Sequence, residues 1–185
     1  ALGLYGLASR VPELVILMLI RVIGQVTFPA YSRLQDDRPA LQRAFLATLR
    51  YLSLVTLPVG IGMAILAGLL VRTLYGNAWV PAIPVLQALA IAATLRSLGS
   101  HAGEIFKATG RPHILTSLGL VRAIVLIPAL IAGARFGIAG VAIAQMLVTG
   151  ASTVLNLVVA GRLLAIPRSA MLAEVRPALL GALIM

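Results

Sequence analysis

Long apolar stretches alternate with short polar ones along the chain, and this pattern predicts helices that cross a membrane. A helix needs about 20 predominantly apolar residues to span the hydrocarbon core of a bilayer. Stretches of this length lie at residues 4–28, 51–71, 81–106, 113–132 and 136–161. Residues 177–185 look like the start of another such stretch. The sequence therefore predicts an all-α, polytopic transmembrane helix bundle with about five complete spans and the beginning of a sixth.

A polar island at residues 28–50 interrupts this pattern. It holds four arginines and only two acidic residues, Asp36 and Asp37. Loops that stay in the cytoplasm carry an excess of Lys and Arg, and two acids followed by Pro39 are typical of the start of a helix. Four of the residues that follow fall on one helical face, namely Leu41, Phe45, Thr48 and Leu52. We interpret residues 32–50 as a basic cytoplasmic loop followed by a helix that runs along the membrane interface.

Four further polar segments connect the predicted spans, and each contains arginine. They lie at residues 72–79, 107–113, 133–137 and 162–176. If the polar island faces the cytoplasm, alternation places the second and fourth of these segments inside and the other two outside. Together with Arg33, Arg38 and Arg43 of the polar island, the two inside segments then hold eight basic residues, against two in the outside segments. This distribution follows the positive-inside rule and supports the predicted topology.

The composition agrees with a lipid environment. The chain is 61% apolar and 11% charged, whereas about a quarter of the residues in a soluble domain are charged. Its net charge is +10, but the basic residues are spread singly between apolar runs, so no basic face forms that could bind nucleic acid. Contact with anionic lipid headgroups accounts better for the positive charge. We therefore expect a membrane protein with no nucleic-acid partner.

The sequence lacks the residue patterns of an enzyme or a metal site. There are no cysteines, and His101 and His113 lack partners at the spacing of a metal site. No Ser-His-Asp context and no phosphate-binding glycine loop is present, and Asp36 and Asp37 are adjacent in a loop. We therefore predict neither a cofactor nor a catalytic activity.

Three arginines inside predicted spans, Arg21, Arg96 and Arg122, are the main candidate binding residues. Ionisable residues inside a membrane are costly, so each suggests a function. A guanidinium group can donate two parallel hydrogen bonds to a phosphate, and Gln25 lies on the same helical face as Arg21. One interpretation is a cationic cavity lined by these four residues. The other is that Arg21 and Arg122 extend along their helices to reach lipid headgroups.

Other polar residues inside the spans have simpler explanations. Gln87 and Gln145 are typical of hydrogen bonds between membrane helices. Glu13 lies near the outer end of the first span, where plain exposure accounts for it. Glu104 lies three residues before Lys107, which favours a local ion pair over a role in proton or cation coupling.

Several motifs, in this order and spacing, resemble those of one known family. The matching residues are Leu4-Tyr5-Gly6-Leu7-Ala8, Val26-Thr27-Phe28-Pro29-Ala30-Tyr31-Ser32-Arg33-Leu34-Gln35, Pro58, Gly76 with Trp79, and Ala108-Thr109-Gly110-Arg111. On these motifs the chain resembles bacterial polysaccharide and lipid-linked oligosaccharide flippases of the multidrug/oligosaccharidyl-lipid/polysaccharide exporter superfamily.

The resemblance implies that residues 1–185 are the C-terminal-half bundle of a larger transporter, facing an N-terminal bundle that is missing here. Such proteins move lipid-linked oligosaccharide or polysaccharide repeat units across the bacterial inner membrane by alternating access. The partner would be a polyprenyl-linked glycan. Its diphosphate or acidic sugars would bind Arg21, Arg96 and Arg122, and its hydroxyl groups would bind Gln25.

Three other functions stay open from the sequence alone. A multidrug exporter of the same superfamily would have a less cationic cavity with more acidic or aromatic residues. A membrane-embedded glycan polymerase or glycosyltransferase would need a catalytic carboxylate on a large external loop, whereas the predicted external turns are short. A scaffold subunit that transports nothing would not need arginines inside its spans.

Overall fold

The computed structural model describes the backbone of residues 2–183 and the side chains of residues 6, 18 and 20–181. Within this part of the chain every regular element is a helix, which confirms the predicted fold class. The elements in order are α1 (Leu2–Arg33), α2 (Arg38–Ile65), α3 (Ala67–Leu74), the 3-10 helix η1 (Asn77–Ala82), α4 (Ile83–Ala108), α5 (Pro112–Ala134), α6 (Gly137–Leu164) and α7 (Arg168–Leu183).

Four helical segments of the described chain are long and apolar enough to cross a membrane. They are α2, η1 together with α4, α5 and α6. The predicted first span, residues 4–28, lies within α1, but most of its side chains, Glu13 among them, lie outside the described residues. The four segments confirm a polytopic bundle.

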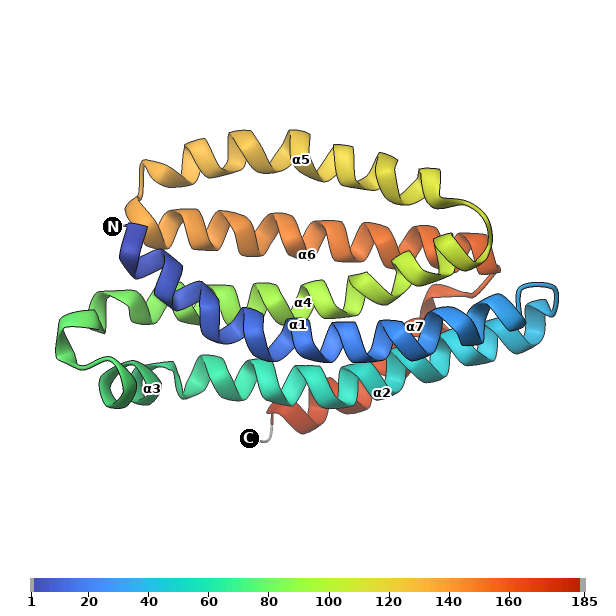
Figure 1. Ribbon diagram of the computed structural model, residues 1–185, viewed down its shortest axis with the longest axis horizontal. Helices are drawn as coiled ribbons and strands as arrows, with labels where there is room; N and C mark the ends of the chain where they lie inside the picture. Colours follow the sequence, from blue (N-terminus) through green and yellow to red (C-terminus); the bar gives the residue numbers. More distant parts are fainter. Residues whose placement is uncertain (1, 184–185) are drawn as a thin grey trace.

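Helix α4 lies at the centre of the bundle. It packs against α1 and α2 on one side and α6 on the other, while α5 packs on the outer side of α6 and α7 on α2 (Figure 1). Glycines permit the closest of these contacts. A Cβ added to Gly99 of α4 would lie 3.2 Å from the Cα of Thr153 in α6, and one added to Gly133 of α5 would lie 2.7 Å from the carbonyl oxygen of Gly140. Gly133 and Gly140 thus allow the backbones of α5 and α6 to approach closely, as small residues do between membrane helices.

Local turn signals in the sequence set several helix boundaries. Asp37 caps α2 by accepting a hydrogen bond from the backbone N–H of Ala40 at 3.0 Å. Gly110 and Gly137 have φ angles of 68° and 76°, values that glycine adopts more readily than other residues. The turns predicted at residues 107–113 and 133–137 are confirmed at these two glycines.

The predicted boundary at residue 50 is absent, because α2 is continuous from Arg38 to Ile65. The apolar face predicted for its first half is real, since Leu41, Phe45 and Leu52 are all buried. This face packs against Phe106 within the bundle core, because an amphipathic stripe can bind another helix as well as a lipid surface. The position of residues 32–50 at the membrane interface stays a prediction.

The loop predicted at residues 162–176 is wrong, because α7 begins at Arg168. Helix α6 ends with Ala165 in the left-handed conformation, and the N–H of Ile166 donates to the carbonyl of Gly161 at 2.8 Å. The chain then reverses and runs back along α2. Arg168 is exposed, while Met171 faces the core, so the charges that suggested a loop mark the solvent side of a helix.

The connections fall at the two ends of the bundle as the predicted alternation requires. Residues 34–37, 109–111 and 165–167 lie at one end, and residues 75–82 and 135–136 lie at the other (Figure 1). Two side chains of α2 link the first group, since Arg38 donates to the carbonyl of Leu163 at 3.3 Å and Gln42 donates to that of Leu164 at 2.6 Å. Which end faces the cytoplasm stays a prediction.

Candidate functional site

Six buried side-chain atoms in the described residues lack a hydrogen-bond partner, and they form two groups. They are Thr27 Oγ1, Tyr31 Oη, Arg96 Nε, His101 Nε2, Arg122 Nε and Asn156 Oδ1. Most buried polar groups in proteins are paired, so each exception calls for an explanation. Arg96, Arg122 and Asn156 belong to α4, α5 and α6, and the other three belong to α1 and α4. Two separate polar regions therefore exist in the bundle.

The first region surrounds a cavity of about 220 Å³ between α5 and α6. Its polar lining comes from Arg122, Ser152 and Asn156, and its walls are apolar, with Leu118 and Leu155 among them. The Ser152 hydroxyl donates to the carbonyl of Val148 in its own helix at 2.8 Å. The Arg122 guanidinium and the Asn156 amide oxygen remain available to a ligand in the cavity.

Arg96 of α4 does not line the cavity, but it adds a second positive charge near Arg122. It lies close enough to Arg122 for the two charges to repel each other. The ion pairs found among the described residues join Arg50 to Glu174 and Lys107 to Glu104, so neither arginine of the pair is neutralised by them. Two like charges beside a cavity favour the binding of an anion.

Arg21 and Gln25 lie elsewhere, on the exposed side of α1. Together with Glu104 and Lys107 they line an open depression of about 410 Å³ between α1 and α4. Arg122 does not line this depression, and Arg21 does not line the cavity between α5 and α6. The structure thus brings Arg96 and Arg122 together and places Arg21 and Gln25 at a different surface.

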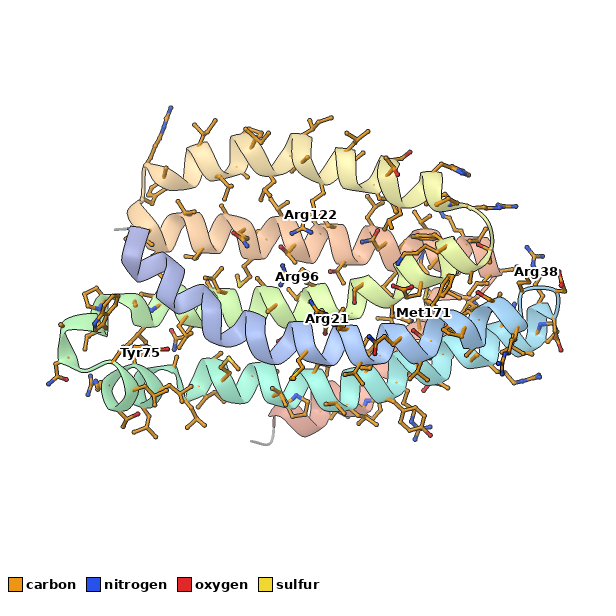
Figure 2. The ribbon with its side chains drawn as sticks, in the orientation of Figure 1. Arg21, Arg38, Tyr75, Arg96, Arg122 and Met171 are labelled. Carbon is orange, nitrogen blue, oxygen red and sulfur yellow. The ribbon has the colours of Figure 1, made fainter. Side chains whose placement is uncertain are left out.

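All three arginines lie near the middle of the bundle's length rather than at its ends (Figure 2). An arginine at the end of a span can reach the headgroups with its long side chain, but a central one has further to go. Arg96 and Arg122 are also half-buried, which is not expected of side chains that extend to the headgroups. These observations favour the cavity over the headgroups for this pair.

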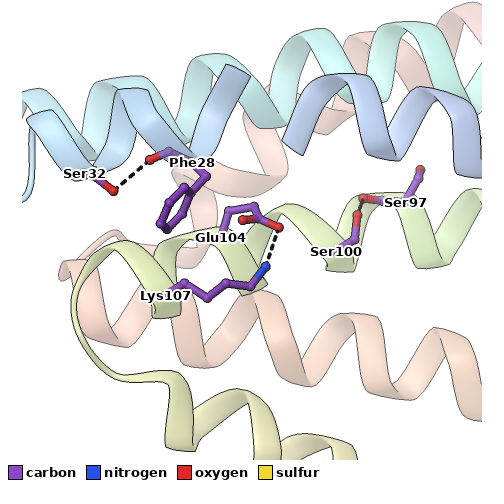
Figure 3. A network of polar contacts seen from close by, with 6 residues as sticks. All are labelled: Phe28, Ser32, Ser97, Ser100, Glu104 and Lys107. Carbon is purple, nitrogen blue, oxygen red and sulfur yellow. Dashed lines mark hydrogen bonds and ion pairs between the residues drawn. The ribbon is translucent and has the colours of Figure 1, made fainter. Parts of the chain in front are cut away.

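The second region lies where α1, α2 and α4 meet. Lys107 donates to the Glu104 carboxylate at 2.9 Å (Figure 3), which confirms the predicted local ion pair. Glu104 lies beneath α1, since a Cβ added to Gly24 would be 3.7 Å from its Oε1. His101 is 2% exposed, and its ring stacks on that of Phe45 with centroids 4.3 Å apart. No group of three potential metal ligands occurs among the described residues.

Gln87 and the residues that the sequence did not single out can now be placed. Gln87 donates to the carbonyl of Ala64 at 3.1 Å, which confirms a hydrogen bond between helices. Ser152 and Asn156 were missed, although a serine and an asparagine four residues apart in an uncharged span would share one helical face. Thr27 was also missed, because a lone threonine in an apolar helix carries no signal of its own.

Comparison with known proteins supports one family. Residues 1–84 match the model of a family described as polysaccharide biosynthesis protein. The chain is 30% identical over 155 residues to the lipopolysaccharide biosynthesis protein WzxC of Escherichia coli, an alignment that covers 83% of this chain and 32% of that protein. It is 29% identical over 114 residues to the teichuronic acid biosynthesis protein TuaB of Bacillus subtilis, covering 62% of this chain and 24% of the relative.

A third relative is named as a transport protein. The chain is 25% identical over 135 residues to the succinoglycan biosynthesis transport protein ExoT of Rhizobium meliloti, covering 73% of this chain and 27% of that protein. The chain therefore spans about a third or less of the length of these relatives. No solved structure matches it.

Proposed function

Because the chain is a relative of the polysaccharide biosynthesis proteins of the exporter superfamily, we propose that it is the later bundle of a flippase. In this proposal the whole transporter moves lipid-linked oligosaccharide or polysaccharide repeat units across the membrane and performs no catalysis. With four helices able to cross a bilayer and relatives of this kind, the chain is a multi-pass protein of the bacterial inner membrane.

The observation that carries the proposal is the closeness of Arg96 to Arg122, which lines the cavity of α5 and α6. Desolvating two positive charges in a membrane is costly, so a bundle without a use for them is expected to lack them. An arginine fork fits a phosphate or carboxylate with two hydrogen bonds. A polyprenyl-linked glycan carries such groups in its diphosphate or its acidic sugars, and Asn156 would add a contact to a hydroxyl group.

Arg21 and Gln25 take a separate role in the proposal. Their depression on α1 and α4 is open and includes Lys107, so it can receive a second part of a long glycan. One substrate would then contact two surfaces of this bundle. The hydroxyl groups of sugars are suitable partners for the amide of Gln25.

We further propose that residues 1–185 form one of two bundles that rock against each other around the substrate. The aligned part covers 32%, 24% and 27% of the three relatives, which leaves room for the other bundle. Alternating access in transporters built from two halves places the substrate at their interface, near the middle of the bilayer. The central position of the three arginines along the helices agrees with that geometry (Figure 2).

The alternative functions are less well supported by the charges. A multidrug exporter would be expected to place an acidic residue at its cavity, but Glu104 is paired with Lys107 and Glu174 with Arg50. Neither acid lines the cavity between α5 and α6. A glycan polymerase would need an acid free to act as a base, and a scaffold would leave the cost of Arg96 and Arg122 unexplained.

The test is export in cells whose only flippase is the transporter that contains this chain. Arg96→Ala and Arg122→Ala should each abolish surface polysaccharide at a normal protein level. Arg→Lys at the same positions should reduce export in part, because lysine keeps the charge but loses the paired donors. Arg135→Ala is the matched control, since Arg135 is exposed in the turn between α5 and α6. Normal export by both alanine variants of the pair would refute the proposal.

A further inference from the structure

The junction of α1, α2 and α4 contains a small cavity that the proposed glycan site does not use, with a few polar groups in a mainly apolar lining. The lining includes Thr27 from α1, Leu52 from α2, and Ser100, His101 and Glu104 from α4. The space open to the centre of a water molecule is about 10 Å³, which is near the minimum that one water requires. Thr27 Oγ1 and His101 Nε2 are both buried there without a partner.

The hydrogen-bonding roles of these groups are complementary to those of water. His101 Nδ1 lies 3.0 Å from the carbonyl oxygen of Leu98. A carbonyl oxygen can only accept, so this bond requires the tautomer with the hydrogen on Nδ1, and in that tautomer Nε2 presents a lone pair. The Glu104 carboxylate is also an acceptor, whereas the Thr27 hydroxyl can donate. One water can therefore donate to Nε2 and to Glu104 while it accepts from Thr27.

We infer that this cavity binds one internal water molecule, which joins Glu104 to His101 and links the open depression of α1 and α4 to the core of the bundle. Glu104 lines both the small cavity and the depression, so it stands between the two. This water satisfies two buried polar atoms, Thr27 Oγ1 and His101 Nε2, that would otherwise remain unpaired. The inference does not depend on which molecule the transporter carries.

Water fits the site better than a metal cation does. A hard cation such as sodium prefers several oxygen ligands, whereas one wall of this cavity is the nitrogen of His101. The hydroxyl of Ser100 already donates to the carbonyl of Ser97 at 2.7 Å (Figure 3). Glu104 is likewise engaged with Lys107.

Water-edited solid-state NMR of the whole transporter in lipid nanodiscs tests the inference, with ring nitrogens labelled in histidine. His101 Nε2 should receive magnetisation from a bound water whose exchange is slower than that of bulk water. His113 is exposed and serves as the internal reference for bulk water. A spectrum in which Nε2 of His101 receives no such transfer would overturn the inference.

Thr27→Val should lower the His101 signal severalfold, because the isosteric methyl group cannot donate to the water. Thr27→Ser keeps the hydroxyl and should restore the signal. Thr94→Val is the matched control, since the Thr94 hydroxyl is equally buried but donates to the carbonyl of Ala90. An unchanged signal in Thr27→Val would overturn the inference. A signal that is lost when sodium chloride is replaced by choline chloride would also overturn it, because the site would then depend on a sodium ion.

Discussion

The two polar regions of the bundle differ in how tightly the helices around them are packed. Around His101 the core is dense, with Phe45 stacked on the imidazole ring and a cavity of about 10 Å³. Around Arg122 the helices are more loosely packed. The cavity there is about 220 Å³, and among the described residues of α5 only Gly133 is buried. The dense region can hold a water and a neutral ring, whereas the open region can admit part of a larger ligand.

The two regions also differ in their charges. Glu104 and Lys107 form an ion pair, so the junction of α1, α2 and α4 carries little net charge of its own. Arg96 and Arg122 have the same sign and repel each other. Such a pair destabilises the empty protein, and an anion that binds between the two side chains would remove the repulsion. The comparison separates a region that maintains the fold from one that is available for function.

The largest expected effect is a loss of stability when the dense region around His101 is disrupted. Phe45→Ala removes a fully buried ring from the contact with His101 and should lower the free energy of unfolding by about 3–5 kcal/mol. Thermal unfolding in detergent and the amount of protein in the membrane would report this loss. Phe136→Ala is the control, because Phe136 is 81% exposed and should change stability little. Equal stability of the two variants would show that the junction is not the stabilising centre.

A smaller change in stability, with the opposite sign, is expected when a charge is removed from the open region around Arg122. Arg122→Leu removes a half-buried charge that repels Arg96, so it should raise the free energy of unfolding by about 1 kcal/mol or more. Export should be lost in the same variant. Thermal unfolding should show the gain in stability, and the amount of surface polysaccharide should show the loss of export. A variant that is both less stable and inactive would indicate a structural role for Arg122.

Asn156→Leu should have a milder effect on export. The amide oxygen of Asn156 is buried at the cavity without a partner, and a neutral hydrogen bond contributes about 1 kcal/mol, or roughly a fivefold change in binding. Substrate binding should weaken by that factor while the protein remains stable. Asn77→Leu, at the first residue of η1, is a control outside the cavity. A loss as large as that of Arg122→Ala would mean that Asn156 contributes more than one neutral contact.

The smallest effect is expected outside both regions. Arg50 and Glu174 join α2 to α7 across 4.0 Å, with 58% and 30% of their side chains exposed. Ion pairs of this kind contribute about 0–1 kcal/mol. Glu174→Gln should therefore leave thermal unfolding almost unchanged, and a marked drop would show that α7 depends on this contact.

Local chemistry made much of the fold predictable. Gly110 and Gly137 adopt the positive φ angles that their turns require, and Pro112 is the first residue of α5. The preferences of these residues act within a few positions, so they can be recognised from the sequence. Helix α7 was not predicted, since Arg168 and Arg176 suggested a loop. Whether a short charged segment folds as a helix depends on the surface it packs against, and the sequence does not reveal that α2 provides one.

The candidate site was predictable only where a single residue carries the signal. Arg96 and Arg122 stood out because a charge in a membrane span is costly in any arrangement. That they lie together, with Arg21 apart, depends on how the helices pack. Asn156, Thr27 and His101 became significant because their buried atoms lack partners, and the absence of a partner appears only in three dimensions.

The most direct test of the central claim, that Arg96 and Arg122 hold one anionic group together, is the affinity of the transporter for a polyprenyl diphosphate in nanodiscs. We expect Arg96→Ala and Arg122→Ala each to weaken binding about tenfold or more, because a hydrogen bond to a charged group contributes roughly 1.5–3 kcal/mol. The double variant should lose less than the sum of the two single losses, since both side chains act on one group. Affinity that is unchanged in all three variants would contradict the claim.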